Sequence, residues 1–434
     1  MKRHILAIAC LAVAQLAAQP APVPDLSALQ SAAERAPSDP FAHYNLGRAY
    51  AARGDWEQAR REFLTAIELR PDYMVPRLAL AQQQLTRREF DAALQTVDDL
   101  LTFDKSNINA RLIQSSALMG QRKFDAARRA LNELAEAQPD SPDVWFQFGV
   151  LELAGNHFEA AESAFRRAQV LNPQNSRGLM GVVETYMAQN KTGDALEILG
   201  SETEKDPTRQ DLLLALANTA VRAGKYDLAV QSFNRVLAQT DPNSKQQGDV
   251  YLRIGETYRR KGDSLGAIQA LQKARETMPD NVVVLSTLAL VLDGAGRRCE
   301  AQQVYEATLK LDPNNAVALN NLAFLLAESG GDLDAALTMA QRAKQLLPNL
   351  YEITDTLGWI YLKKNLSDNA IEIFKDLVVK APNQSTFHYH LGMALYQKGD
   401  KPKAIKELND ALKYNPPKDE RDKVQQLLTR LTGA

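Results

Sequence analysis

Two short segments of the sequence carry residue types that could do chemistry. Residues 262–266 read Gly-Asp-Ser-Leu-Gly and match G-x-S-x-G, the pattern of a nucleophilic serine on a strand–turn–helix elbow. His388 and His390 lie two residues apart, and imidazole is a common metal ligand. The first pattern would indicate a hydrolase and the second a metal site, so each depends on the element that positions it.

Neither segment lies in a setting that supports this chemistry. Residues 262–266 fall between two predicted helices, in register with Gly54-Asp55, whereas an elbow needs a strand before its serine. Helical residues two apart point about 200° away from one another, so His388 and His390 cannot bind one ion. We expect His388 in the core and His390 toward a groove. The sequence therefore predicts no catalytic residues, no metal and no cofactor, with a hydrolase as a remote alternative.

The surrounding elements repeat with a fixed period. Eleven alanines recur every 34 residues, except for single intervals of 38 and 35: Ala59, Ala93, Ala127, Ala161, Ala195, Ala229, Ala267, Ala301, Ala336, Ala370 and Ala404. A small residue at such a period is typical of a solenoid of helical hairpins. The first repeat, counted from Pro40 as position 1, also has Leu46, Gly47, Tyr50, Phe63, Ala66 and Pro71.

These residue types explain how a hairpin forms. Gly47 and Ala59 are small, so two antiparallel helices can approach closely, and Tyr50 and Phe63 fill the space where the helices diverge. Pro71 cannot continue a helix and sets the turn into the next repeat. Each repeat is therefore predicted to be a helix–turn–helix.

This pattern resembles the tetratricopeptide repeat (TPR) family, whose signature is Trp-x2-Leu-Gly-x2-Tyr, then Ala-x3-Phe-x2-Ala, then Pro. The resemblance covers residues 40–416. It implies an all-α fold, an α-solenoid that forms a right-handed superhelix of about eleven tandem repeats. It also implies that the first helix of each repeat lines a concave groove, and that members mostly bind peptides or partner proteins and do not catalyse reactions.

The chain is predicted to contain five regions. Residues 1–18 read as a signal peptide, and 19–39 as a linker with an N-terminal half-repeat. Repeats 1–6 occupy 40–243 and repeats 7–11 occupy 244–416, with a joint expected at the four-residue insertion within 239–245. Residues 417–434 carry an apolar stripe and are predicted to form a C-terminal capping helix: Val424, Leu427, Leu428 and Leu431.

The signal peptide predicts export, to the periplasm or outside the cell. An ordinary N-terminal helix is the alternative reading, and a lipid anchor at Cys10 is another, although only five apolar residues precede that cysteine. The chain has 51 basic and 53 acidic residues, so no net charge favours nucleic acid as a partner. After the signal, the longest apolar stretch is 282–292, too short to span a bilayer.

The fifth repeat is predicted to open before its neighbours. Four glycines lie in it: Gly178, Gly181, Gly193 and Gly200. Glu202 also replaces the small residue expected at its position. A glycine inside a helix costs about 1 kcal/mol relative to alanine.

The resemblance assigns positions 2, 5, 6, 9, 12 and 13 of each repeat to the groove. In repeats 2–6 these positions are largely apolar, in repeat 7 they include arginines, and in the last repeats they are aromatic. The predicted ligand-binding residues are Leu85, Met119, Phe146, Val150, Leu153, Met180, Met187, Val221, Arg253, Arg260, Trp359, Tyr389 and Met393. Exposed apolar surface of this extent marks an interaction site, and methionine adapts to varied partners.

The predicted partner is therefore a protein or peptide with an apolar segment, helical or extended. A segment of a second copy of this chain would also fit, which leaves a homo-oligomer open. The chaperone-tail clamp, Lys at position 5 with Asn at position 9, occurs in no repeat. The function predicted is an exported scaffold or adaptor, in envelope, surface-polysaccharide or pilus assembly, with a general periplasmic holdase as the alternative.

Overall fold

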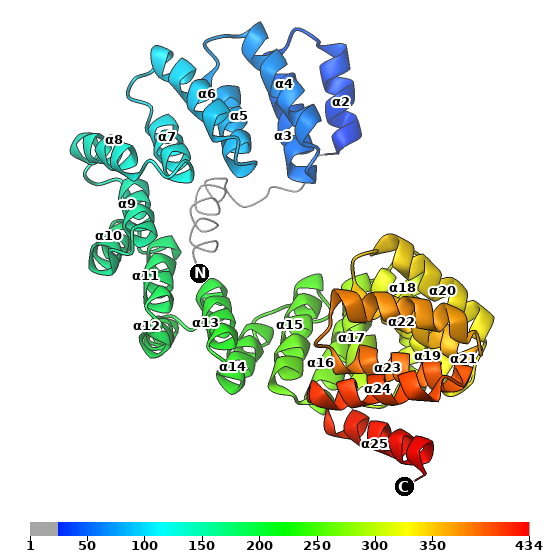
Figure 1. Cartoon of the computed structure of the whole chain (residues 1–434). Coiled ribbons are helices and arrows are strands. Elements are labelled where there is room, and N and C mark those ends of the chain that lie inside the picture. Colours follow the sequence, from blue (N-terminus) through cyan, green and yellow to red (C-terminus); the bar gives the residue numbers. More distant parts are fainter. Residues whose placement is uncertain (1–24, 434) are drawn as a thin grey trace. The chain divides into compact units, whose positions relative to one another are not determined.

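The computed structural model describes residues 25–433, and its regular elements in this part of the chain are all α-helices (Figure 1). Residues 1–24 and 434 lie outside the described part. The predicted signal peptide, the start of the linker and the lipid-anchor alternative at Cys10 therefore lie outside it as well.

The helices form tandem pairs, as predicted from the 34-residue period. The first helices of the eleven repeats are α3 (Pro40–Arg53), α5 (Met74–Thr86), α7 (Ile108–Gly120), α9 (Pro142–Ala154), α11 (Arg177–Ala188), α13 (Gln210–Arg222), α15 (Lys245–Lys261), α17 (Val282–Gly294), α19 (Ala316–Ser329), α21 (Tyr351–Lys363) and α23 (Ser385–Lys398). The second helices are α4 (Trp56–Leu69), α6 (Phe90–Phe103), α8 (Phe124–Ala137), α10 (Phe158–Leu171), α12 (Thr192–Lys205), α14 (Tyr226–Leu237), α16 (Ser264–Thr277), α18 (Arg298–Leu311), α20 (Leu333–Leu346), α22 (Ser367–Lys380) and α24 (Lys401–Lys413). This all-α solenoid confirms the predicted fold class.

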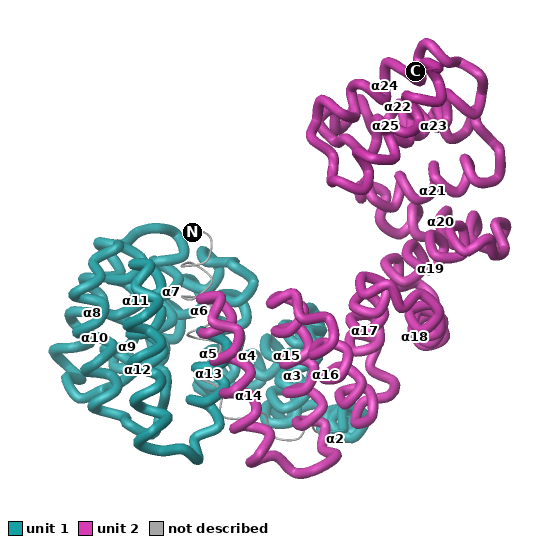
Figure 2. Tube along the Cα trace, turned by 90° about the horizontal axis from the view of Figure 1, so that it is seen from below, with its two compact units in different colours: residues 1–219 teal, residues 220–434 magenta. Residues whose placement is uncertain are grey.

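The chain divides into two compact units, residues 1–219 and 220–434, coloured separately in Figure 2. The division lies within α13. The insertion at 239–245 lies inside unit 2, where it lengthens the connection between α14 and α15, and α15 has 17 residues. The boundary predicted at residue 243 and the right-handed superhelix of the whole array stay predictions.

The small residues of the repeat are where the helices cross. All eleven recurring alanines are fully buried, at 0% exposure. At the glycine position, a Cβ added to Gly149 would lie 2.4 Å from the ring of Phe165 on the second helix of the same repeat. Gly47 and Gly358 meet Phe63 and Phe374 in the same way. The repeat pattern therefore specifies a tight contact that only the smallest residues allow.

The turn between the two helices of a repeat uses a left-handed residue at position 15. It is glycine in six repeats and asparagine in three, with φ near 60–90°. Arg88 and Arg122 adopt the same conformation in repeats 2 and 3. In repeat 7 the residue is Gly262, and the next residue, Asp263, accepts a hydrogen bond from the Gly266 amide at 2.9 Å. The G-x-S-x-G match is thus a helix–turn–helix capped by aspartate, not a nucleophile elbow.

A second recurring contact joins one repeat to the next. The side chain at position 4 of several repeats contacts the backbone carbonyl of the residue six earlier, usually the proline that ends the preceding repeat. The contacts are His43 Nε2 to Pro37 O at 3.1 Å, Arg77 to Pro71 O, Arg111 Nε to Lys105 O at 2.9 Å, Trp145 Nε1 to Pro139 O at 2.7 Å, and His388 Nε2 to Pro382 O at 3.0 Å. Because a carbonyl only accepts, these side chains donate.

Single helices cover both ends of the described array. α2 (Leu26–Arg35) packs on α3, as the predicted half-repeat does. At the other end, α25 (Lys418–Thr432) fully buries Val424 against Leu408 and Ala411 of α24. Ser385 and Thr386 donate to the Glu420 carboxylate at 2.8 and 2.7 Å. The predicted C-terminal capping helix is therefore confirmed.

Candidate binding surfaces

The structure buries most of the predicted groove residues of unit 1. Leu85, Met119, Val150 and Leu153 are each 1% exposed and Phe146 is 7% exposed. The expectation that positions 9 and 12 face open space in these repeats is wrong. No ligand can reach these side chains without a rearrangement of the helices.

Packing between neighbouring first helices explains this burial. Met119, Val150 and Leu153 belong to one hydrophobic cluster that includes Phe146 and Phe165. The first helices α5, α7, α9 and α11 contact one another in sequence, so side chains on their facing flanks fill the seams between them. Large apolar residues at these positions are therefore core residues. The family's assignment of positions to the groove does not specify how widely adjacent helices are separated, so it could not reveal this burial.

Most of the remaining predicted residues are more accessible, but Trp359 is buried. Met180, Met187 and Val221 are half-buried, as are Tyr389 and Met393, whereas Arg253 and Arg260 are exposed. Trp359 is 9% exposed. The structure brings Trp359 and Tyr389 together on either side of His390, whose ring lies 4.6 Å from the Trp359 ring and 5.5 Å from the Tyr389 ring.

The polar groups around Trp359 are paired with one another. Its Nε1 donates to Glu328 at 2.8 Å, and Lys363 lies 2.8 Å from the same carboxylate oxygen and over the indole ring. Burial raises the pKa of Glu328, but the hydrogen bonds from Lys363 and Trp359 outweigh it, so the net shift is downward. His390 pairs with Asp355 at 2.8 Å. This network fixes the Trp359 ring on the first helix of repeat 10.

Four of the exposed apolar residues lie on the first helices of repeats 8 and 9. Leu290 of α17 and Phe324 of α19 both occupy position 9 and are 42% and 37% exposed. Val283 and Val317 occupy position 2 on the same helices and are 56% and 39% exposed. Positions 2 and 9 differ by seven residues and so share one helical face. Trp359 and Met393 continue position 9 into repeats 10 and 11, and we call the four position-9 residues the apolar ladder: Leu290, Phe324, Trp359 and Met393.

Polar and charged groups border this ladder. Arg259 and Arg260 are exposed at the end of α15 in the preceding repeat. Beside the ladder, Ser286 Oγ and Asn320 Oδ1 are buried and have no hydrogen-bond partner within residues 25–433. The Asn320 amide nitrogen donates to Asn321 at 3.0 Å. The surface thus combines apolar contact area with unused polar atoms and a basic end.

An aromatic patch at the start of unit 1 was missed by the sequence analysis. Phe41 is 48% exposed, and its ring lies 4.9 Å from the Tyr73 ring. The Tyr44 ring lies 5.7 Å from the same Tyr73 ring. Arg70 and Arg48 lie over the Phe41 and Tyr44 rings. Phe41 and Tyr44 occupy groove positions 2 and 5, so extending the projection to the first repeat would have found them.

A buried carboxylate in unit 1 stands where most repeats have tyrosine or leucine. Glu152 is 6% exposed and accepts from Arg128 Nη2 at 2.9 Å, with His157 Nδ1 at 2.8 Å. Burial raises the pKa of Glu152, while the hydrogen bonds from Arg128 and His157 lower it, and the net shift is downward. These contacts tie α9 to α8 and to the turn before α10.

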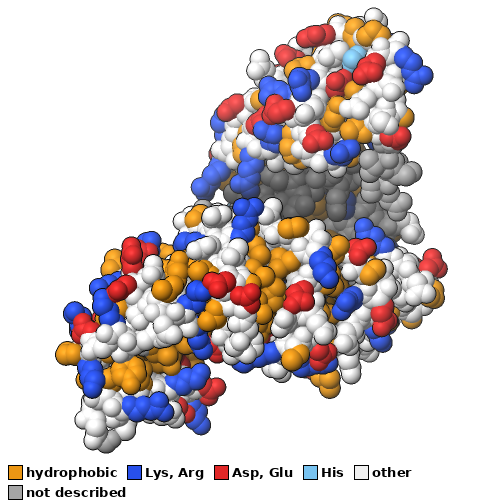
Figure 3. Space-filling model, turned by 90° about the vertical axis from the view of Figure 1, so that its right-hand side faces the viewer, with side chains coloured by type: hydrophobic (Ala, Val, Ile, Leu, Met, Phe, Trp, Pro, Cys, Tyr) orange, Lys and Arg blue, Asp and Glu red, His pale blue; other side chains and the backbone are white. Residues whose placement is uncertain are grey.

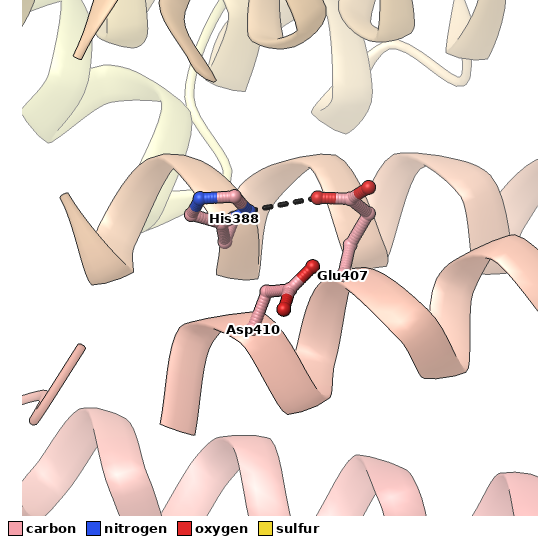
Figure 4. Close-up of side chains that lie close together, drawn as sticks. All are labelled: His388, Glu407 and Asp410. Carbon is pink, nitrogen blue, oxygen red and sulfur yellow. Dashed lines mark hydrogen bonds and ion pairs between the residues drawn. The ribbon is translucent and has the colours of Figure 1, made fainter. Parts of the chain in front are cut away.

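One cluster has the donor types of a metal site. The ligand atoms of His388, Glu407 and Asp410 lie within 4.8 Å of one another (Figure 4). Both ring nitrogens of His388 already contact protein atoms, Glu407 at 2.8 Å and the Pro382 carbonyl at 3.0 Å. His43 makes the same two kinds of contact in repeat 1, where no second carboxylate completes a set of three ligands. The histidine–glutamate pair is therefore a packing device at position 4, and His388 is a core residue as predicted.

The surface shows no extended field of one charge on the face that Figure 3 presents. Among the described residues on that face, Lys and Arg alternate with Asp and Glu, and hydrophobic side chains gather in patches between them. Among residues 25–433, no helix combines the length and hydropathy that a membrane span requires.

Stacked helical hairpins with an apolar ladder on their first helices define a helical-repeat scaffold, a class that typically binds other proteins. Family models agree with this class. Residues 130–247 match the cytochrome c-type biogenesis protein H TPR domain, and tetratricopeptide repeat models match residues 40–73, 214–281, 304–338 and 356–420. The chain is a tetratricopeptide repeat protein.

Similar proteins come from both eukaryotes and bacteria. The chain is 22% identical to the Protein CTR9 homolog of Arabidopsis thaliana over 78% of its length, and 23% identical to cellulose synthase operon protein C of Pseudomonas fluorescens over 80%. It spans only 32% and 29% of those proteins. The chain is also 23% identical to the BBSome complex member BBS4 homolog of Drosophila melanogaster, over 63% of this chain and 58% of that protein's length.

Solved structures of the same fold are also similar. The Cut9–Hcn1 hetero-tetramer of the APC/C matches 94% of this chain and 92% of that one, with a TM-score of 0.43 and 14% identity. YrrB, described as a TPR protein with an unusual peptide-binding site, matches 44% of this chain and 97% of its own, with a TM-score of 0.35 and 21% identity.

Proposed function

We propose that this chain is an exported adaptor that holds an apolar segment of a partner protein on the first helices of repeats 8–11. The observation that carries the proposal is the apolar ladder, with Leu290 and Phe324 about two-fifths exposed on successive repeats. Exposed apolar side chains in register on neighbouring repeats form a continuous contact strip, whereas isolated ones need no explanation.

The chemistry of the surface narrows the partner segment. Apolar residues spaced one helical turn or two apart would contact the ladder, and acidic residues at one end would meet Arg259 and Arg260. An amphipathic helix with an acidic terminus, or an extended strand of the same composition, fits both features.

The similarity to cellulose synthase operon protein C supports a place in an assembly that handles surface polysaccharide. Export agrees with the signal-peptide pattern of residues 1–18. Both parts of the proposal extend beyond the interaction scaffold that the fold defines.

The test compares one double variant and one single variant of the chain that begins at residue 19 with their parent. Leu290→Glu with Phe324→Glu places two charges on the ladder, and Val379→Glu is the control because Val379 is 78% exposed on second helix α22. Crosslinking in the native organism identifies the stoichiometric partner, and titration with its purified fragments gives the dissociation constant. We expect the double variant to bind at least tenfold more weakly, with the control unchanged.

Two results would contradict the adaptor. Equal affinity of the double variant and the parent would remove the ladder from the interface. Suppression of aggregation for several unrelated heat-unfolded proteins, with no stoichiometric partner recovered, would favour the holdase alternative.

A further inference from the structure

Position 12 of the first helix is a core position in many of the repeats. In five of them its residue is apolar and buried: Leu85, Met119, Leu153, Ala327 and Leu362. Repeat 8 has Asp293 at this position, near the end of α17. A carboxylate therefore stands where other repeats pack an apolar side chain between adjacent first helices.

The Asp293 carboxylate has no partner in the described part of the chain. It is half-buried and makes no hydrogen bond or ion pair within residues 25–433. Burial raises the pKa of Asp293, and the positive charge of Arg298 at the start of α18 opposes this only in part. An ionised group that loses water without gaining a partner lowers the stability of a fold. Packing within one chain thus gives no reason for an aspartate here.

Asp293 lies beside the exposed part of the apolar ladder. Leu290 and Asp293 are three residues apart on α17 and share one helical face, and Leu290 is 42% exposed. Burial raises the pKa of Tyr305 on α18 to about 12, and the negative charge of Asp293 adds to this effect. The Tyr305 oxygen accepts from Asn321 Nδ2 of α19 at 3.0 Å. The carboxylate therefore lies near the junction of repeats 8 and 9, next to the surface proposed to hold the partner.

We propose that Asp293 selects partner segments that carry a lysine or arginine among their apolar residues. A segment that covers Leu290 also removes water from the Asp293 carboxylate, and a buried charge is costly unless it is paired. An ammonium or guanidinium group supplies the missing donors. A neutral or acidic residue at the same place leaves the carboxylate unpaired, so the segment that carries it is rejected. The inference rests on the proposed adaptor function, because the ladder must hold the segment first.

The preceding repeat sets a spacing for the partner's charges. Arg259 occupies position 12 on α15 as Asp293 does on α17, and these two helices contact each other. Packed helices lie about 8–10 Å apart. In a segment that crosses the first helices, an acidic residue opposite Arg259 and a basic residue opposite Asp293 would lie about three residues apart if the segment is extended. In a helix they would lie about six to seven residues apart.

The alternative is that Asp293 stabilises the fold through Arg298, and a test without ligand separates the two roles. Asp293→Asn in the chain from residue 19 removes the charge at nearly constant size. Asp422→Asn is the matched control, because Asp422 is exposed on α25 and has no hydrogen bond or ion pair within residues 25–433. We expect the urea midpoint to rise for Asp293→Asn and to stay unchanged for Asp422→Asn. An unchanged or lower midpoint for Asp293→Asn would overturn the proposal.

The binding test uses a phage-displayed library of fully randomised peptides as the probe. Selection on the parent should enrich lysine or arginine at one place between apolar residues, selection on Asp293→Asn should lose this enrichment, and Asp293→Lys should enrich aspartate or glutamate instead. A selected peptide should bind the parent at least tenfold more tightly than its lysine-to-glutamine form, and Asp293→Asn should reduce that difference to less than twofold. Circular dichroism verifies that each variant is folded, and the Asp293→Asn comparison decides the matter if Asp293→Lys is not.

The outcomes distinguish this inference from the adaptor itself. Peptides that require Leu290 and Phe324 but show no preference for a basic residue would overturn the role of Asp293 and leave the adaptor in place. A basic preference that persists in Asp293→Asn would have the same meaning. Failure to select any peptide that is lost with Leu290→Glu and Phe324→Glu would contradict the ladder as a binding surface, and this inference with it.

Discussion

Replacing Gly149 by alanine measures how tightly the helices of a repeat cross. The added Cβ would lie 2.4 Å from the Phe165 ring, and Phe165 is completely buried, so the ring cannot move away into solvent. Overpacking of this kind costs about 1–3 kcal/mol, and the better helix propensity of alanine returns roughly 0.5–1 kcal/mol. We expect a net loss of about 1–2 kcal/mol in the free energy of unfolding.

Gly200→Ala in α12 is the matched control. No atom lies within 4 Å of the position its Cβ would take, so only the propensity gain applies, about 0.5–1 kcal/mol of stabilisation. The two variants make the same chemical change in helix interiors of neighbouring repeats and should shift the urea midpoint in opposite directions. Hydrogen exchange at α9 and α12 locates each effect, because stability in a repeat array is distributed along the chain.

The outcome that refutes this reasoning is a Gly149→Ala protein as stable as Gly200→Ala. A second check is Phe165→Leu in the Gly149→Ala background. If the clash is with the ring, the smaller side chain should recover part of the loss, and the two changes should be non-additive because the residues are in contact.

Two further predictions concern neighbouring parts of unit 1. Glu152→Gln should lower stability at neutral pH by about 1–3 kcal/mol, since it removes a charge that accepts from Arg128 and His157. The pKa of Glu152 in the folded chain lies below its ordinary 4.5, so its contribution to stability is complete above pH 4.5 and is lost as the pH falls through the lower folded value. Between pH 3 and 7 the free energy of unfolding should therefore change less with pH in the variant than in the parent. An equal change in both proteins would contradict this assignment. Residues 176–209 should exchange amide hydrogens faster than residues 142–175, and equal protection would show that the fifth repeat is not the weakest.

The repeating core of this fold could be predicted from the sequence because each signature residue has one packing role. The alanine period marks helix crossings that the structure buries completely, and the glycine at position 8 meets a phenylalanine ring in three repeats, as at Gly149, and a leucine in two others. The rejection of the G-x-S-x-G match also holds, since Gly262 and Asp263 make the left-handed turn and the helix cap. These features depend on contacts within one repeat, where the sequence contains both partners at fixed spacing.

Which residues form the binding surfaces depends on the spacing between repeats, and the sequence alone did not predict that spacing. Val150 and Leu290 are both apolar and both stand at position 9 of their repeats, but one is 1% exposed and the other 42%. The difference comes from how closely adjacent first helices pack, which is set by side chains on two different repeats.

The donor at position 4 has a consequence for how such arrays can be rebuilt. Its acceptor is a backbone carbonyl, which every residue at the preceding turn provides, and histidine, arginine and tryptophan all reach it. One hairpin can therefore follow another of unrelated sequence and still make this bond when its fourth residue can donate, whereas the repeats with leucine at this position join without it: Leu179, Leu213, Leu285 and Leu319. Duplication, deletion or transplantation of modules that carry a donor at this position preserves the bond, so chain length can change in steps of one module without new chemistry at those junctions.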